Sequence, residues 1–162
     1  MKKVYCLFDR CLGCRSCEIA CAVAHSAGRG LEEAMGEKER PRSRLRIRNA
    51  GGRPLPVQCR HCDTPACAEA CISGAIRKDA ETGRVASDPE RCVRCWMCVM
   101  ACPYGAILFR PETAAERCDL CREEDEPACV RACPTKALLF CERAEFESLL
   151  GKERRRMKPA IP

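Results

Sequence analysis

Sixteen of the eighteen cysteines in this 162-residue chain fall into four runs, and their spacing is the strongest chemical signal in the sequence. The first and third runs read C-x2-C-x2-C-x3-C. The second and fourth are stretched variants, C-x2-C-x4-C-x3-C and C-x2-C-x7-C-x3-C. The members are Cys11, Cys14, Cys17, Cys21; Cys59, Cys62, Cys67, Cys71; Cys92, Cys95, Cys98, Cys102; and Cys118, Cys121, Cys129, Cys133. Four copies of one pattern indicate one kind of site built repeatedly.

These runs suit cuboidal iron–sulfur clusters, because three thiolates at such short spacing can reach three corners of one cube. In the bacterial form, C-x2-C-x2-C-x3-C-P, the fourth cysteine ligates the other cluster of a pair. Pro103 and Pro134 follow the third and fourth runs, whereas Ala22 and Ile72 stand at those places after the first and second. The pattern predicts four [4Fe–4S] clusters on sixteen cysteines.

Structural zinc and disulfides are the competing interpretations. Zinc prefers two C-x2–4-C pairs separated by a longer loop, and three cysteines within seven residues crowd such a site. Disulfides belong to oxidising compartments, and residues 1–10 contain no apolar run typical of a secretory signal. No stretch approaches the roughly 18 apolar residues of a membrane span. We therefore expect a cytoplasmic protein without a membrane span, and clusters rather than zinc or disulfides.

The formal net charge of +6 counts every thiol as neutral. Four oxidised clusters with their thiolates would bring it to about −2, so the basic composition alone does not indicate a nucleic-acid partner, and none is expected. A zinc-bearing nucleic-acid-binding module using Arg44, Arg46, Arg48 and residues 154–156 is the alternative from another class of protein.

The elements around the runs predict an α+β fold of short helices and small antiparallel β-hairpins. Apolar segments at 74–76, 105–109 and 136–140 indicate short strands, and residues 76–78 and 84–86 flank a turn at Gly83 as a hairpin. Residues 44–48 alternate basic and apolar side chains, and Gly51 and Gly52 turn the chain toward 54–57, which predicts an exposed hairpin with a basic face. Residues 26–41 indicate a charged loop with one helical turn, and 142–157 an amphipathic helix.

The residues outside the runs are given structural roles. Cys6 and Cys141, in predicted neighbouring strands, are interpreted as buried apolar residues. His25 and His61 are interpreted as hydrogen-bond donors or surface residues near the clusters, since every run is already complete. Trp96, Met97 and Tyr104 would shield sulfur from water. No phosphate loop, catalytic triad or substrate pocket is indicated, so we expect neither an enzyme nor a small-molecule substrate.

Residues 6–141 resemble the four-cluster ferredoxin-like subunits of the dimethyl sulfoxide reductase iron–sulfur family. The resemblance implies a single polyferredoxin domain over residues 1–162, made of two bacterial-type 2[4Fe–4S] ferredoxin-like modules. Residues 1–25 with 111–141 would form the outer module and 57–110 the inner one. Residues 26–56 would be an inserted loop and hairpin, and 142–162 a C-terminal helix and tail.

The same resemblance implies which cysteines share a cluster, because in that family the first run pairs with the fourth and the second with the third. Carried over, it gives cluster 1 on Cys11, Cys14, Cys17 and Cys133; cluster 2 on Cys59, Cys62, Cys67 and Cys102; cluster 3 on Cys92, Cys95, Cys98 and Cys71; and cluster 4 on Cys118, Cys121, Cys129 and Cys21.

Within that family, residues 13–23 (GCRSCEIACAV), with His25 and Ser26 after them, are similar to the iron–sulfur subunit that accompanies nickel carbon monoxide dehydrogenase. Residues 59–63, 71–75 and 95–100 agree. This implies electron transfer from carbon monoxide dehydrogenase to a hydrogenase or a flavin-dependent NAD(P) oxidoreductase. The alternative is an electron-transfer subunit of a molybdenum or tungsten pterin enzyme, such as a formate or aldehyde oxidoreductase.

Overall fold

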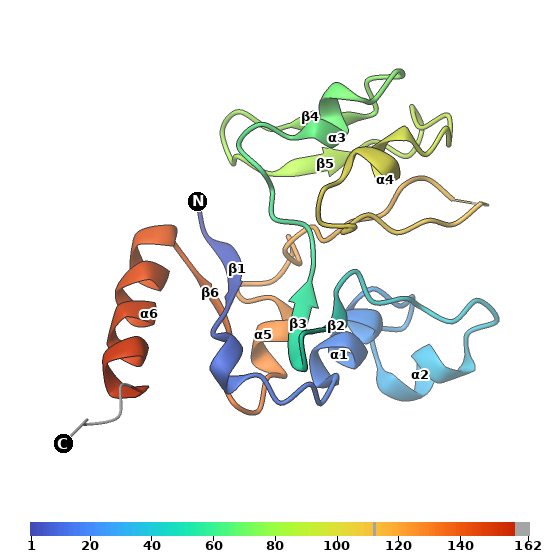
Figure 1. Cartoon of the computed structure of the whole chain (residues 1–162). Coiled ribbons are helices and arrows are strands. Elements are labelled where there is room, and N and C mark those ends of the chain that lie inside the picture. Colours follow the sequence, from blue (N-terminus) through green and yellow to red (C-terminus); the bar gives the residue numbers. More distant parts are fainter. Residues whose placement is uncertain (112, 158–162) are drawn as a thin grey trace.

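The structure, a computed structural model, describes residues 1–111 and 113–157. The elements are arranged in two lobes (Figure 1). The first lobe combines both ends of the sequence, and the second is built from its middle. Segments far apart in the chain therefore meet in the first lobe.

In the first lobe, strand β1 (Lys3–Cys6) pairs antiparallel with β6 (Leu138–Cys141), with Lys3 opposite Cys141. The 3-10 helix η1 (Phe8–Arg10) follows β1. Helix α1 (Ser16–Ala24), which carries the end of the first cysteine run, packs on α5 (Ala128–Arg131), which carries part of the fourth. Leu45, Val130 and Leu138 form the core here together with buried cysteines. The cysteines thus occupy the positions that apolar side chains fill in an ordinary core.

The segment between the first two runs supplies helix α2 (Leu31–Gly36) and a hairpin of β2 (Arg46–Ala50) with β3 (Arg53–Val57). Gly51 and Gly52 form its turn with φ of +59° and +80°. Two consecutive positive φ angles match the twist of a tight hairpin and favour glycine. The predicted hairpin and helical turn are both confirmed.

The second lobe contains α3 (Ala66–Glu69) packed near α4 (Met97–Ala101), and a hairpin of β4 (Ile76–Lys78) with β5 (Val85–Ser87). Ile76, Val85, Ile107 and Ala115 form its core, against which cysteines of the second and third runs pack. The predicted hairpin around Gly83 is confirmed. Two short helices and one hairpin therefore enclose these two runs.

Helix α6 (Arg143–Met157) follows β6 and lies along the side of the first lobe (Figure 1). Phe146 stacks on Tyr5 of β1, with ring centroids 4.6 Å apart. The predicted C-terminal helix is confirmed, and one of its apolar side chains packs on its own lobe. The side chains of residues 154–157 and all of residues 158–162 lie outside the described part of the chain. None of the described helices combines the length and apolarity that a bilayer crossing requires.

Two local expectations are wrong. Residues 105–109 form no strand, and Leu108 makes only an isolated bridge to Glu116. Pro111 lies just beyond, and a proline cannot donate to a ladder. The alternating pattern places Arg44 on an exposed basic face, but its guanidinium is largely covered and pairs with Asp119 at 2.5 Å. The first difference comes from a nearby proline, and the second from a tertiary contact that overrides a local pattern.

Candidate metal centres

All four cysteine runs contain backbone in the left-handed region. These residues are Gly13 and Arg15 in the first run, His61 in the second, Arg94 and Trp96 in the third, and Leu120 and Cys121 in the fourth. Each non-glycine residue in that region costs of the order of 1 kcal/mol or more, and such strain persists where the surroundings impose it, commonly at ligand sites. Six of the eight described non-glycine residues with positive φ lie in the x2 loops or at their borders, and Arg29 and Lys136 are the other two. Such a concentration is what closely spaced ligands to a common centre require.

The sulfur of the fourth cysteine in each run accepts hydrogen bonds. The backbone N–H groups of Arg44, Ala106 and Ala137 donate to the sulfurs of Cys21, Cys102 and Cys133 at 3.3, 3.4 and 3.2 Å. In Cys71, burial raises the pKa, but backbone donors and the Ser73 hydroxyl outweigh it and lower the pKa overall. The pKa of Cys133 is lowered in the same way. These donors favour thiolates, the form that binds metal.

Thiols of the first and fourth runs meet in the first lobe. A negative charge on Cys133 would raise the pKa of Cys14 and of Cys17, so the three sulfurs lie near one another. A small cavity is lined by Cys11, Cys14, Cys17 and Cys133. A negative charge on Cys21 would likewise raise the pKa of Cys118, Cys121 and Cys129. The first lobe thus brings thiols of the first and fourth runs together, and Cys6 lies beside Cys11, Cys17 and Cys133 as well.

The second lobe gathers the other two runs. Negative charges on Cys62 and Cys67 would raise the pKa of Cys59. Charges on Cys92, Cys67 and Cys71 would raise that of Cys98. Cys67, Cys71, Cys98 and Cys102 belong to the same packed core. Between the lobes, the charge of Cys59 reaches Cys118, so the second and fourth runs face each other.

Burial makes several of these thiols poor thiolates unless a cation neutralises them. Burial is the main reason that the pKa of Cys17 is raised, to about 11. It is also the main reason that the pKa values of Cys118 and Cys129 are raised. An iron core carrying positive charge reverses this effect, because a coordinating thiol is deprotonated outright. Crowded, buried and mutually repelling thiols therefore fit iron–sulfur ligation.

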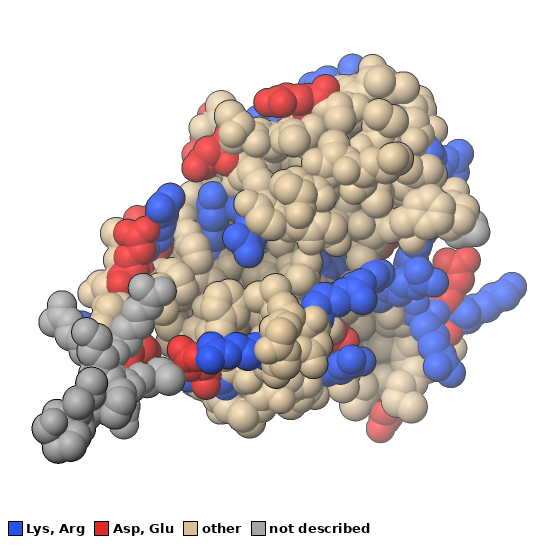
Figure 2. Space-filling model, in the orientation of Figure 1, with Lys and Arg blue, Asp and Glu red and all other residues tan. Residues whose placement is uncertain are grey.

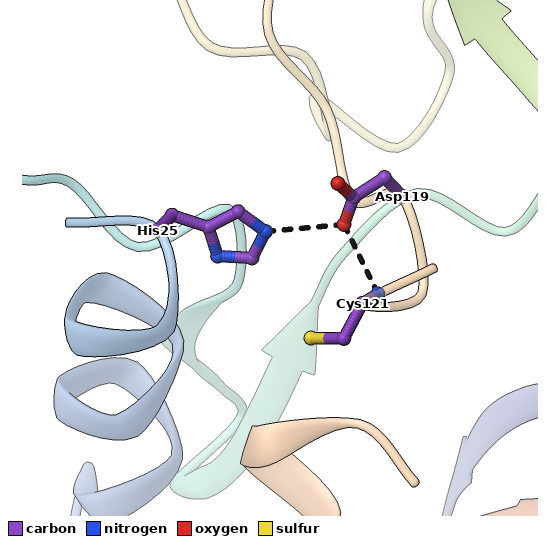
Figure 3. A group of neighbouring side chains, drawn as sticks. All are labelled: His25, Asp119 and Cys121. Atoms are coloured by element: carbon purple, nitrogen blue, oxygen red, sulfur yellow. Dashed lines mark hydrogen bonds and ion pairs between the residues drawn. The ribbon is translucent and has the colours of Figure 1, made fainter. Parts of the chain in front are cut away.

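A smaller group joins Cys121 of the fourth run to His25 and Asp119 (Figure 3), with one potential ligand atom from each residue within 4.8 Å of the others. The His25 ring places Nε2 3.1 Å from Asp119 Oδ1 and Nδ1 2.7 Å from the carbonyl oxygen of Cys21. Asp119 Oδ1 also accepts the Cys121 N–H at 3.1 Å, and Oδ2 accepts from Arg44. The His25 nitrogens and Asp119 oxygens are therefore already hydrogen-bonded. Through these bonds the group holds the backbone of the fourth run at Cys121 in place.

The electrostatics of this group agree with that role. Burial lowers the pKa of His25, but its hydrogen bonds to Asp119 and Cys21 outweigh burial and raise the pKa to about 10. Burial raises the pKa of Asp119, but the hydrogen bond from His25 and the charge of Arg44 hold it well below the usual range. An imidazolium and a carboxylate therefore stabilise each other here.

The remaining sequence expectations have mixed outcomes. Cys6 and Cys141 are both buried, in neighbouring strands as predicted, although they lie at opposite ends of the ladder. His61 is fully buried, not at a surface, and its Nδ1 accepts the Val85 N–H at 2.9 Å. Trp96 packs edge-on against Phe109, whereas Met97 and Tyr104 are 47 % and 42 % exposed and shield little.

Sequence reasoning missed two functional candidates near the fourth run, Asp119 and Arg117. Arg117 is 4 % exposed, and its Nη1 donates to the sulfur of Cys67 at 3.4 Å. Both flank Cys118 in the sequence, and this position beside a ligand was the one available signal. Their partners could not be foreseen, because Cys67, His25 and Arg44 come close to them only through the fold.

Strained thiol-rich loops, amide donors to sulfur and two cysteine-lined cores define an iron–sulfur protein of the ferredoxin type. Comparison with known families agrees: residues 53–143 match the 4Fe-4S dicluster domain, and residues 8–24 match a 4Fe-4S binding domain. This protein belongs to the 4Fe-4S dicluster domain family and binds [4Fe–4S] clusters.

Among curated proteins, an iron–sulfur protein of Rhodospirillum rubrum is 39 % identical over 97 residues, which is 60 % of this chain and 50 % of that protein. The probable anaerobic dimethyl sulfoxide reductase subunit YnfG of Escherichia coli is 38 % identical over 97 residues, 57 % of this chain and 47 % of the relative. The electron transport protein HydN of the same organism is 37 % identical over 92 residues, 57 % and 50 % of the two proteins. This chain spans about half the length of the curated relatives it matches. The resemblance to the dimethyl sulfoxide reductase iron–sulfur family is confirmed.

Among solved structures, the active-site complex BamBC of benzoyl coenzyme A reductase aligns with 22 % identity and a TM-score of 0.47, covering 99 % of this chain and 93 % of the other. A likeness at this level carries no conclusion about function.

Proposed function

We propose that this chain is a cytoplasmic electron-transfer protein that holds four [4Fe–4S] clusters and passes electrons between larger redox proteins. The grouping of thiols from the first and fourth runs in one lobe, and of the second and third in the other, carries the proposal. Each cluster supplies a one-electron redox centre when bound. The protein has no substrate chemistry of its own in this proposal and acts as a non-catalytic partner of an oxidoreductase.

The chain's own residues hold and insulate these centres. In cluster 1, Cys11, Cys14 and Cys17 would ligate together with Cys133; in cluster 4, Cys118, Cys121 and Cys129 with Cys21. In cluster 2, Cys59, Cys62 and Cys67 would ligate with Cys102; in cluster 3, Cys92, Cys95 and Cys98 with Cys71. The charge contacts of Cys133 and Cys21 support the first two sets, and the packing of Cys67, Cys71, Cys98 and Cys102 supports the others.

The decisive measurement of the cofactor is iron and acid-labile sulfide on anaerobically purified protein, with visible spectra before and after dithionite. We expect about sixteen iron atoms per chain, from four iron atoms at each of four sites, and a brown colour that bleaches on reduction. About eight iron atoms would refute the count of four. Zinc, or a colourless protein, would refute the proposal and favour a nucleic-acid-binding module, whose affinity would fall steeply with salt.

The crossing of fourth ligands has its own test. Cys102→Ser should perturb the EPR spectrum of the centre held by Cys59, Cys62 and Cys67, with Cys141→Ser as the matched control outside the runs. Loss of the centre held by the Cys92 triplet alone would show that runs and sites coincide, against this assignment.

Exposed apolar side chains on the second lobe support docking of a redox partner there. Ile72, Val93 and Met100 are 77 %, 60 % and 83 % exposed, and the visible face of that lobe is largely uncharged (Figure 2). Leu12, Ile19 and Met35 are likewise exposed on the first lobe, so it is the largely uncharged face of the second lobe that favours docking there. An apolar rim close to the third run would bring a partner within electron-transfer reach.

For the identity of the partners, we propose carbon monoxide dehydrogenase as donor and a hydrogenase or flavin-dependent NAD(P) oxidoreductase as acceptor. The likeness of residues 13–23 to the subunit of that enzyme supports this route. A molybdenum or tungsten pterin enzyme is the second candidate, favoured by the similarity to the dimethyl sulfoxide reductase subunit YnfG. Co-purification from the native organism separates the two, because a nickel enzyme or a pterin enzyme would accompany the chain.

A further inference from the structure

Arg117 places a buried positive charge where the two lobes meet. It directly precedes Cys118 of the first lobe, and its Nη1 donates to the sulfur of Cys67 in the second lobe at 3.4 Å. The side chain is 4 % exposed, and its Nε and Nη2 atoms are buried without hydrogen-bond partners among the described residues. It lines a cavity of about 480 Å³ whose wall also includes His61, Arg84 and Asp119. The guanidinium therefore bridges the two lobes.

This charge lacks a carboxylate counter-ion in the described part of the chain. None of the ion pairs there includes Arg117. The acidic neighbours are engaged elsewhere, Glu116 with Arg110 and Asp119 with Arg44 and His25. Burying an unpaired charge costs several kcal/mol. An anion is therefore expected within reach of the guanidinium.

Besides His61, whose pKa is lowered by burial and also by this charge, Arg117 faces thiols of the second lobe. Besides its hydrogen bond to Cys67, its charge acts on Cys59 and on Cys98, and in both thiols it opposes the effect of burial. Cys59 and Cys67 belong to the same run and to the same proposed ligand set. A cluster on four thiolates carries a net negative charge, so it supplies the missing counter-ion.

We infer that Arg117 is the counter-ion of the cluster held by Cys59, Cys62, Cys67 and Cys102, and that it raises the reduction potential of that centre. This rests on the proposed four-cluster function. A cation beside the cluster stabilises the reduced form, which carries one more negative charge, and a donor to ligand sulfur acts in the same direction. Because Cys59 also faces Cys118 across the lobes, the tuned centre lies at the crossing between them.

The test is a redox titration of the full-length, cluster-loaded chain followed by EPR, on Arg117→Gln, Arg117→Met and Arg117→Lys. Arg122→Gln is the matched control, because Arg122 lines the same cavity but is exposed, and water screens its charge. In Arg117→Gln and Arg117→Met, we expect one centre to become harder to reduce by about tenfold or more, about 59 mV for one electron. That centre should be the one that Cys102→Ser perturbs. Arg117→Lys, which keeps the charge, should retain most of the potential.

Unchanged midpoints in the neutral variants at full iron content would overturn the inference, as would an equal shift in Arg122→Gln. If the neutral variants lose the iron of one centre while Arg117→Lys keeps it, no midpoint can be compared for that centre. The iron content then shows that the centre needs a positive charge at this position. Loss of that iron in Arg117→Lys as well would assign Arg117 a packing role and refute the electrostatic one. Fewer than sixteen iron atoms in the unsubstituted chain would count against the four-cluster function, a separate failure.

Discussion

Replacing Asp119 by Asn should speed the loss of iron from the centre proposed at Cys118, Cys121, Cys129 and Cys21. The carboxylate accepts hydrogen bonds from His25, Arg44 and the backbone of Cys121, and its side chain is 27 % exposed. Asn keeps an acceptor for the Cys121 amide but removes the charge that holds the other two. A hydrogen bond to a charged group contributes about 1.5–3 kcal/mol. Allowing for partial exposure, the loss comes to about 2–4 kcal/mol.

A loss of about 2 kcal/mol multiplies the population of the locally opened state about thirty-fold. When opening is fast relative to capture, the rate of iron loss to a chelator follows that population. The assay is the decay of visible absorbance under anaerobic conditions with excess chelator, compared among the unsubstituted protein, Asp119→Asn and Asp63→Asn. Asp63 likewise adjoins a proposed ligand, Cys62, but its side chain is 88 % exposed, so that control should change little. Equal rates in all three proteins would refute the bracing role of Asp119.

Three further predictions concern other contacts. The stabilisation of the His25–Asp119 pair should be greatest between pH about 4 and 6.5. It should be lost toward alkaline pH, as His25 deprotonates through its raised pKa of about 10, and in acid, as Asp119 protonates; flat iron-retention kinetics from pH 6 to 10 would contradict this. Phe146→Ala should free α6 from Tyr5, a loss of about 0.5–1.5 kcal/mol beyond the buried area, seen as faster hydrogen exchange in α6 and not in β4. Cys6→Ala should keep the full iron content, because Cys6 lies outside the runs; loss of four iron atoms would make Cys6 a ligand.

The parts of the fold that the sequence reveals are those set by local chemistry. Gly51 and Gly52 specify the hairpin turn through their positive φ angles, and the spacing of Phe146, Leu149 and Leu150 specifies α6. The cysteine spacing identifies the cofactor because few other sites accept three thiolates so close together. These signals need only neighbouring residues.

The remainder depends on contacts between distant segments. Residues 105–109 have strand propensity, but no distant segment pairs with them, and Leu108 makes only an isolated bridge to nearby Glu116. Arg44 lies in an alternating basic pattern, yet it turns inward because Asp119, 75 residues later, accepts its guanidinium. Arg117 resembles any other surface arginine until the second lobe covers it. The sequence around Arg117 does not show that its charge is buried, because its partner Cys67 belongs to another run.

The pairing of β1 with β6 imposes an order on biosynthesis. Lys3 meets Cys141 only after Cys141 has left the ribosome, whereas α3, β4, β5 and α4 lie within about 40 consecutive residues. Contacts between distant residues form late because long loops must close first. The middle lobe would therefore mature first, while the N-terminal thiols wait, exposed to oxidation and to competing metals. A delivery system that loads the nascent chain would have to protect Cys11, Cys14 and Cys17 until the C-terminal segment arrives.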